Sequence, residues 1–126
     1  MQNNNYQQKA DLKRRAYIYA LQMIKFIEGL DDKDSVVRMI SQQLLRSATS
    51  IGANIIEAQA GSTKKDFTNF FSYALKSANE TKFWLGLLRD SGKANKEKTN
   101  ELLQETTELA NILASSILTL KGKKKF

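Results

Sequence analysis

The stretch Arg46–Phe71, RSATSIGANIIEAQAGSTKKDFTNFF, is the most informative part of this chain. It reads as a helix whose small residues let another backbone come close, then a turn at Gly61, then a second helix with an aromatic face. Asn54 and Glu57 lie three residues apart on one side of the first helix, among isoleucines. A carboxylate in such surroundings is costly unless something pairs with it. The stretch therefore predicts a packing and assembly device rather than a reaction centre.

Apolar residues recur three and four positions apart on both sides of this stretch, which is the spacing of amphipathic helices. The expected helices cover about residues 8–29, 35–60, 64–91 and 96–120. Their N-caps are Asp34 or a neighbour for the second helix, Thr63 for the third and Asn95 for the fourth, and Gly61 and Gly92 are terminators. Because the turns are short, successive helices should pack antiparallel. We expect an all-α, up-down-up-down four-helix bundle forming a single domain over residues 1–126, with flexible ends at 1–7 and 122–126.

The composition excludes several kinds of site. The chain of 126 residues contains no cysteine, hence no disulfide or thiolate metal site, and no histidine, the usual general base and commonest metal ligand. No apolar run reaches the roughly 20 residues of a membrane span, and the N-terminal segment is polar. We expect a cytoplasmic protein that is not an enzyme, with no catalytic residue, no metal and no cofactor.

The formal net charge of +7 favours a polyanionic partner, RNA or DNA. The candidate nucleic-acid-binding residues are Lys13, Arg14, Arg15, Lys64, Lys65, Lys76, Lys82, Arg89, Lys123, Lys124 and Lys125. The chain shows no base-reading motif, so phosphate contacts should dominate, with weak sequence preference. The alternative is that the charge serves solubility or a protein partner.

The first and third expected helices carry apolar stripes wider than the roughly 100° that an isolated bundle needs. Large aromatics lie at the margins of these stripes: Tyr19, Phe26, Phe70, Tyr73 and Trp84. We expect the surplus to cover a second copy of the chain; alternatively these rings lap over the protomer's own core. The candidate structural or interface residues are Arg46, Ser50, Asn54, Glu57, Phe70, Tyr73 and Trp84. Arg46 is about three turns, roughly 16 Å, from Glu57, so the two could meet only across a subunit boundary.

Acidic residues on the last two helices are interpreted as exposed charge. Asp66, Glu80 and Asp90 do not fall at one level of a helix, as ligands of a divalent cation would. The run Glu97, Glu101, Glu105 and Glu108 is expected to be a solvated stripe, or else a surface for a basic partner. A nuclease that uses Glu57 or Asp66 with a metal is the least favoured alternative.

A set of short motifs is familiar: Ser47, Ser50-Ile51, Ala53-Asn54-Ile55 and Glu57, then Lys65-Asp66-Phe67, Phe70-Phe71, Ala74, Ser77, Ala78 and Glu80. Together they resemble the bacterial four-helix-bundle family of S23 or 23S rRNA intervening-sequence proteins, which includes the accessory variability proteins of diversity-generating retroelements. The resemblance covers nearly the whole chain and is sharpest between Arg46 and Leu88. Ala58 stands where the family pattern has glycine.

This resemblance implies a homopentameric barrel with a basic outer surface. In the retroelement branch it implies a nucleic-acid-binding partner of a reverse transcriptase, needed for cDNA synthesis. In the other branch the gene lies inside a ribosomal RNA insertion and the role is undefined. We therefore expect a non-enzymatic, oligomeric nucleic-acid-binding adaptor that acts with a reverse transcriptase. The alternatives are a protein encoded by an rRNA insertion and a structural interaction module.

Overall fold

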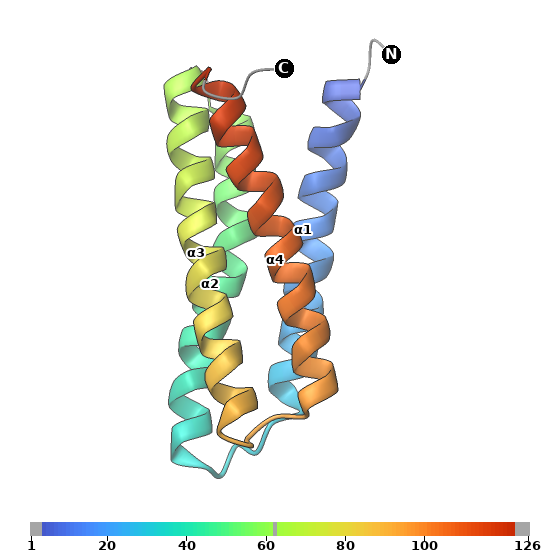
Figure 1. The fold of residues 1–126 in the computed structure, drawn as a ribbon, viewed down its shortest axis with the longest axis vertical. Coiled ribbons are helices and arrows are strands. Elements are labelled where there is room, and N and C mark those ends of the chain that lie inside the picture. The colour runs from blue at the N-terminus through green and yellow to red at the C-terminus, as the bar shows by residue number, and fades with distance from the viewer. Residues whose placement is uncertain (1–3, 62, 123–126) are drawn as a thin grey trace.

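The computed structural model describes residues 4–61 and 63–122, with side chains from residue 11 onward. This part of the chain folds into four helices: α1 (Asn4–Glu28), α2 (Ser35–Ala60), α3 (Lys64–Asp90) and α4 (Lys96–Leu120). Successive helices run in opposite directions, so α1 begins and α4 ends at the same end of the bundle (Figure 1). The all-α, up-down-up-down arrangement predicted from the apolar spacing is confirmed.

Three helices begin at the predicted capping residues. Oδ1 of Asp34 accepts hydrogen bonds from the backbone N–H groups of Val36 and Val37. Thr63 and Asn95 accept equivalent bonds at the starts of α3 and α4. Each bond satisfies a backbone donor that a helix start would otherwise leave unpaired.

The remaining helix ends differ in part from expectation. α1 begins at Asn4, so residues 4–7, which were expected to be flexible, are helical. The expected flexibility of residues 1–3 and 123–126 lies outside the described residues. Gly92 adopts the left-handed conformation, with φ of 74°, at the end of α3. Gly61 ends α2 with φ of −68°, so it terminates that helix in an extended rather than a left-handed conformation.

Small side chains bring the helices close together in the core. Ala48, Ala58, Ala74 and Ala78 are fully buried between α2 and α3 and the flanking helices. Gly52 on α2 faces α1, where a Cβ in its place would lie 3.5 Å from the Cβ of Ala16. The prediction that this segment serves close helix packing therefore holds within the protomer.

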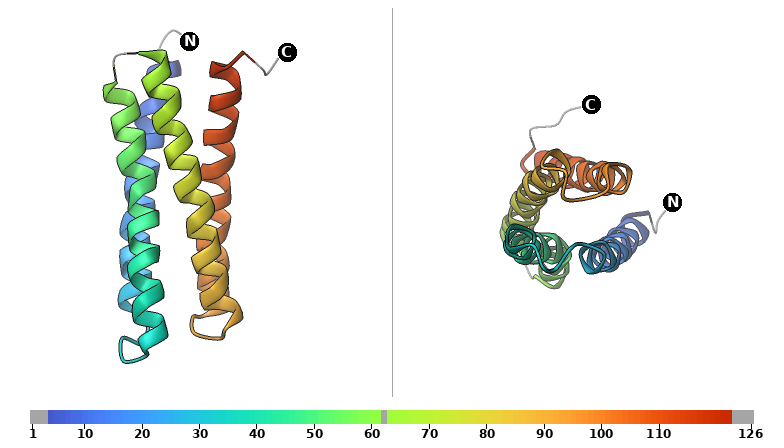
Figure 2. Two further views of the ribbon diagram at one scale, coloured as in Figure 1. Left: turned by 90° about the vertical axis from the view of Figure 1, so that its left-hand side faces the viewer. Right: turned by 90° about the horizontal axis from the view of Figure 1, so that it is seen from below.

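The four helices form an open arc rather than a closed square. α2 and α3 pack together along most of their length, α1 packs on α2, and α4 packs on α3. α1 and α4 meet only over a short stretch, and in the described chain α1 and α3 do not pack against each other. Seen from below in Figure 2, α1 and α4 lie at the two ends of the arc. The surfaces of α1 and α3 are therefore separate.

Candidate nucleic-acid interface

The predicted basic residues fall into two groups on different helices. Lys13, Arg14 and Arg15 are on α1, whereas the other described candidates, Lys64, Lys65, Lys76, Lys82 and Arg89, are on α3. Because α1 and α3 are not neighbours in the described protomer, these groups do not form one continuous patch. Lys123, Lys124 and Lys125 lie outside the described residues.

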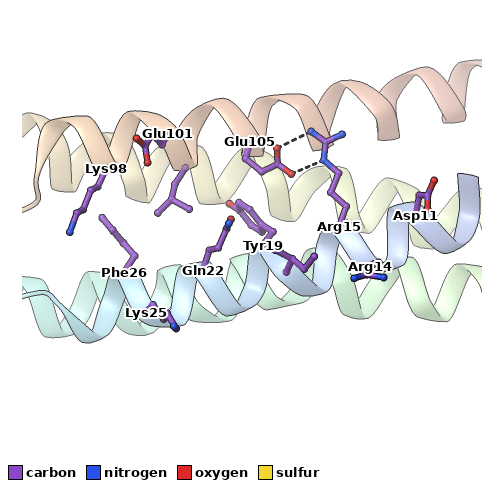
Figure 3. A pocket seen from close by; sticks show the side chains of 12 residues that line it. Asp11, Arg14, Arg15, Tyr19, Gln22, Lys25, Phe26, Lys98, Glu101 and Glu105 are labelled. Carbon is purple, nitrogen blue, oxygen red and sulfur yellow. Dashed lines mark hydrogen bonds and ion pairs between the residues drawn. The ribbon is translucent and has the colours of Figure 1, made fainter.

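Arg15 is engaged within the protomer. Its Nε and Nη2 donate to the two carboxylate oxygens of Glu105 at 2.6 and 2.8 Å, and Nη2 also donates to Oε1 of Glu108 at 2.5 Å. Figure 3 shows this side chain reaching from α1 to Glu105 on α4. The hydrogen bond with Glu105 is the largest cause of a raised pKa for the guanidinium. Two members of the acidic run on α4, expected to be solvated, are thus ion-paired, and Arg15 is a poor phosphate ligand.

Arg89 is engaged as well. Its Nε donates to Oδ1 of Asp90 at 2.8 Å, and its Nη1 donates to the side-chain oxygen of Asn100 on α4 at 2.8 Å. The hydrogen bond from Arg89 holds the pKa of the Asp90 carboxyl below its usual range. Arg89 therefore serves the α3–α4 contact, and the exposed Asp90 beside it would repel a phosphate.

Six predicted cations remain without a carboxylate. Among the described residues no ion pair is made by Lys13, Arg14, Lys64, Lys65, Lys76 or Lys82. Lys82 is half-buried and the other five are exposed. Lys64 and Lys65 open α3, where backbone N–H groups add to the attraction for phosphate. The structure thus divides the predicted cations into those free to bind phosphate and those already neutralised.

A groove of about 760 Å³ runs between α1 and α4 (Figure 3). Ile18, Phe26 and Leu102 contribute apolar surface to it. Its charged lining mixes both signs: Asp11, Glu101 and Glu105 beside Arg14, Arg15, Lys25 and Lys98. Such a mixture is unfavourable for a polyanion, because the carboxylates repel the phosphates that the cations attract.

The Tyr19 hydroxyl beside this groove is buried and hydrogen-bonded. Tyr19 is 0% exposed, and its hydroxyl shares a hydrogen bond with Oγ1 of Thr106. Burial raises the pKa of Tyr19, so the phenol stays protonated. The interpretation of Tyr19 as an aromatic at the margin of its helix was wrong: this ring belongs to the core.

Polar side chains line the α2–α3 contact, among them Ser50 and Asn54 of the predicted structural set. The hydroxyls of Thr81 and Ser47 share a hydrogen bond at 2.9 Å, Ser77 donates to Ser50 at 3.0 Å, and Nδ2 of Asn54 donates to Oγ of Ser50 at 2.9 Å. These bonds pair hydroxyl and amide groups where two helices pack closely.

The expectation that Asn54 and Glu57 are buried together is wrong for Glu57. Asn54 is half-buried, but Glu57 is exposed. Arg46 does not approach Glu57; it pairs with Glu80 on α3. Its guanidinium also donates to the side chain of Gln43. Glu57 in this protomer is a solvent-facing carboxylate.

The aromatic residues of α3 form two edge-to-face pairs. Phe70 and Tyr73 have ring centroids 6.0 Å apart, and Phe83 and Trp84 have centroids 5.0 Å apart. Nε1 of Trp84 donates to Glu80 at 3.0 Å. Phe83, which is 57% exposed, was missed at the level of sequence. The signal was present, because Phe83 fits neither apolar stripe of its helix.

Exposed apolar side chains lie on α1 and α2, which pack against each other. Tyr17, Leu21 and Ile24 lie at spacings of four and three on α1, and Tyr17 is 65% exposed. Leu45 and Ile56 are exposed on α2, to either side of the Gly52 that contacts Ala16 of α1. We call these five residues the α1–α2 strip. Exposed apolar surface of this kind marks interaction sites.

Two further classes of site are absent from the described ranges. Between residues 4 and 122, Ser62 apart, no group of three or more His, Cys, Asp or Glu residues could hold a metal ion. No helix in the same part of the chain is both long and apolar enough to cross a membrane.

The fold and the surface define a basic four-helix-bundle protein. The family model of the 23S rRNA-intervening sequence protein matches residues 8–115, and the chain belongs to this family. The chain also resembles a crystal structure from Bacteroides thetaiotaomicron VPI-5482, of a protein with unknown function from the S23 ribosomal protein family. The two share 36% sequence identity with a TM-score of 0.78, over 84% of this chain and 97% of that one. No curated protein matches significantly. The family predicted from the motifs is confirmed.

Proposed function

We propose that this protein is a non-enzymatic, homo-oligomeric nucleic-acid-binding adaptor. The observation that carries the proposal is the set of predicted cations on α1 and α3 that no carboxylate of the described chain neutralises. Phosphate is the partner for which unpaired lysines and arginines supply binding energy without base-reading contacts. The net charge of +7 acts in the same direction.

Self-association is the second part of the proposal. The α1–α2 strip is a suitable surface for a second copy, because burying it removes several large apolar side chains from water. A closed ring repeats the separate α1 and α3 cations around its outside, so that weak contacts act together on one strand. The resemblance to the retroelement accessory proteins favours five copies in the ring.

The most specific part of the proposal concerns the biological setting. We place the adaptor in the cytoplasm beside a retroelement reverse transcriptase, where it would hold template RNA or product cDNA during synthesis. The description of the matching family favours a second candidate, a protein encoded within a 23S rRNA insertion. Genome context separates these candidates: a neighbouring reverse-transcriptase gene supports the first, and a position inside an rRNA operon supports the second.

The binding proposal is tested with adjacent arginines that differ in their engagement. Arg14 is exposed and makes no ion pair with any described residue, whereas Arg15 is held by Glu105 and Glu108. We expect Arg14→Gln and, as a separate variant, Lys65→Gln each to weaken RNA binding and to lower the salt slope by roughly 0.7–0.9 per lost phosphate contact. Arg15→Gln should change the slope little. The measurement is fluorescence anisotropy of labelled RNA between about 50 and 200 mM salt.

One result would overturn the binding proposal. It is overturned if wild-type protein, shown by circular dichroism to be folded, binds neither RNA nor DNA even at the lowest salt concentration. An Arg15→Gln loss equal to that of Arg14→Gln would instead show that the ion pairs of Arg15 do not withhold it from phosphate.

A further inference from the structure

The two edge-to-face aromatic pairs of α3 each combine an inner ring with an outer one. Phe70 and Trp84 are half-buried, whereas Tyr73 and Phe83 are 50% and 57% exposed. The interplanar angles are 78° for Phe70–Tyr73 and 70° for Phe83–Trp84. In an edge-to-face contact the inner ring can cover only one face of the outer ring. At least one face of both Tyr73 and Phe83 is therefore left uncovered by its ring partner.

Unpaired lysines share this side of α3. Lys65, Lys76 and Phe83 are separated by eleven and seven residues, so at 100° per residue they project within roughly 20° of one another. Tyr73 precedes Lys76 by three residues, so it projects about 60° from Lys76 and about 80° from Phe83, on the adjoining part of the same side. Both lysines are exposed, and neither forms an ion pair within the described chain. Exposed aromatic rings thus alternate with cations along one helix.

Three acidic residues of α3 lie near this side, and two of them are neutralised within the described chain. The carboxylate of Glu80 is bound by Arg46 of α2 and by the indole N–H of Trp84, and Asp90 is paired with Arg89. Asp66 is exposed beside Lys65, so Lys65 and Lys76 together still leave this side positive as well as aromatic. The centres of the two aromatic pairs are twelve residues apart, which is about 18 Å along the helix axis.

We propose that the outer side of α3 binds single-stranded nucleic acid, with bases stacked on Tyr73 and Phe83 and phosphates at Lys65 and Lys76. The proposal rests on the nucleic-acid-binding function proposed above and specifies the form of the ligand. Bases have accessible faces in single strands, whereas in a duplex each face is covered by the next base pair. We call Lys65, Tyr73, Lys76 and Phe83 the aromatic–basic track. Such a track can bind a strand of any sequence, because every base has a face that can stack on a ring.

The charge of the track favours a nucleic acid over a second copy of this chain. The protein carries a formal net charge of +7, so two copies repel each other unless an apolar contact compensates. On α3, Lys76 lies between the two exposed rings. The α1 part of the α1–α2 strip has no such interruption, because its exposed apolar residues follow one another at helical spacing: Tyr17, Leu21 and Ile24. The α1–α2 strip is therefore the better surface for self-association.

The test compares one labelled strand of about 15 nucleotides with its own duplex, bound to the full chain. Tyr73→Leu and Phe83→Leu keep an apolar side chain but remove the ring. Each should weaken single-strand binding about fivefold or more, which is the lower end of the stacking contribution per base, and should leave duplex binding unchanged. Leu87→Ala is the matched control, because Leu87 is an exposed, non-aromatic residue of the same side; it should alter neither affinity.

Each other outcome has a definite meaning. If the ring variants weaken both ligands equally, or neither, the track is wrong while the general binding function survives. If they and Leu87→Ala instead reduce the mass of the assembly, the face belongs to a second copy and the inference is overturned. If the wild-type protein binds neither strand nor duplex, the proposed function itself fails.

Discussion

Tyr19 shows how a single buried hydroxyl is accommodated in an apolar core. Oγ1 of Thr106 donates to the carbonyl oxygen of Leu102 at 2.6 Å, which uses its only hydrogen. The hydroxyl of Tyr19 must therefore be the donor in its hydrogen bond with Thr106. The raised pKa of the Tyr19 hydroxyl, caused by burial, keeps that donor protonated. The pair joins α1 to α4 where these helices otherwise meet little.

This assignment predicts unequal effects for two conservative substitutions. Thr106→Val removes the acceptor and leaves a buried O–H unpaired, so the free energy of unfolding should fall by about 1–3 kcal/mol. Tyr19→Phe should cost less, since Thr106 keeps its bond to Leu102. Urea denaturation gives both values. Adding Tyr19→Phe to Thr106→Val should restore part of the loss; equal single costs with no such recovery would contradict the assignment of the donor.

At the scale of the elements, Asp34 connects the start of α2 to the α3–α4 turn. Its Oδ1 caps α2, and its Oδ2 accepts a 2.7 Å bond from Nζ of Lys93. The bond from Lys93 is the largest cause of a lowered pKa for the Asp34 carboxyl, followed by the bond from the N–H of Val37. The sequence predicted the cap, because a cap lies beside its helix. It did not predict Lys93, which is 59 residues away.

The lowered pKa gives a stability effect of known sign. A carboxyl with a depressed pKa in the folded protein stabilises it fully above the ordinary value of about 3.9, and this contribution is lost as the pH falls through the folded pKa. Asp34→Asn keeps a capping oxygen but loses the charge. The variant should melt below the wild type at pH 7, and the difference should shrink on acidification below about pH 4.

Thermal melts at a series of pH values measure this difference. Asp32→Asn is the control, because Asp32 is an exposed carboxylate in the same turn whose side chain forms no ion pair with a described residue. It should lower the melting temperature less. A gap between wild type and Asp34→Asn that stayed constant down to the acid limit would argue against the ion pair.

At the scale of the whole molecule, the open arc leaves apolar surface on its outside. The sequence predicted surplus apolar surface but assigned it to aromatics that include Tyr19. The structure buries Tyr19 and exposes Leu21, which is 46% exposed, together with the other residues of the α1–α2 strip. These positions look alike in a periodic sequence, and only the direction in which α2 and α4 flank α1 distinguishes them.

Self-association through the α1–α2 strip can be tested with one charge. Leu21→Glu should lower the mass of the assembly without loss of helix, because a carboxylate buried between copies would lack a partner. Leu118→Glu is the control: Leu118 is similarly exposed, but on α4, away from the strip. Light scattering after size exclusion measures the mass. A monomeric wild-type protein, or equal effects of both substitutions, would refute the interface.

The sequence by itself determined the four helices, their caps and the family, because helical periodicity and capping depend on residues within a few positions of one another. The tertiary structure alone decided which cations remain available. Arg14 and Arg15 are adjacent in the chain, yet only Arg15 meets Glu105, 90 residues away. The packing of the helices likewise leaves the Glu57 carboxylate and the Phe83 ring exposed to solvent. Such outcomes depend on which helix lies beside which, and that arrangement is a property of the packed core.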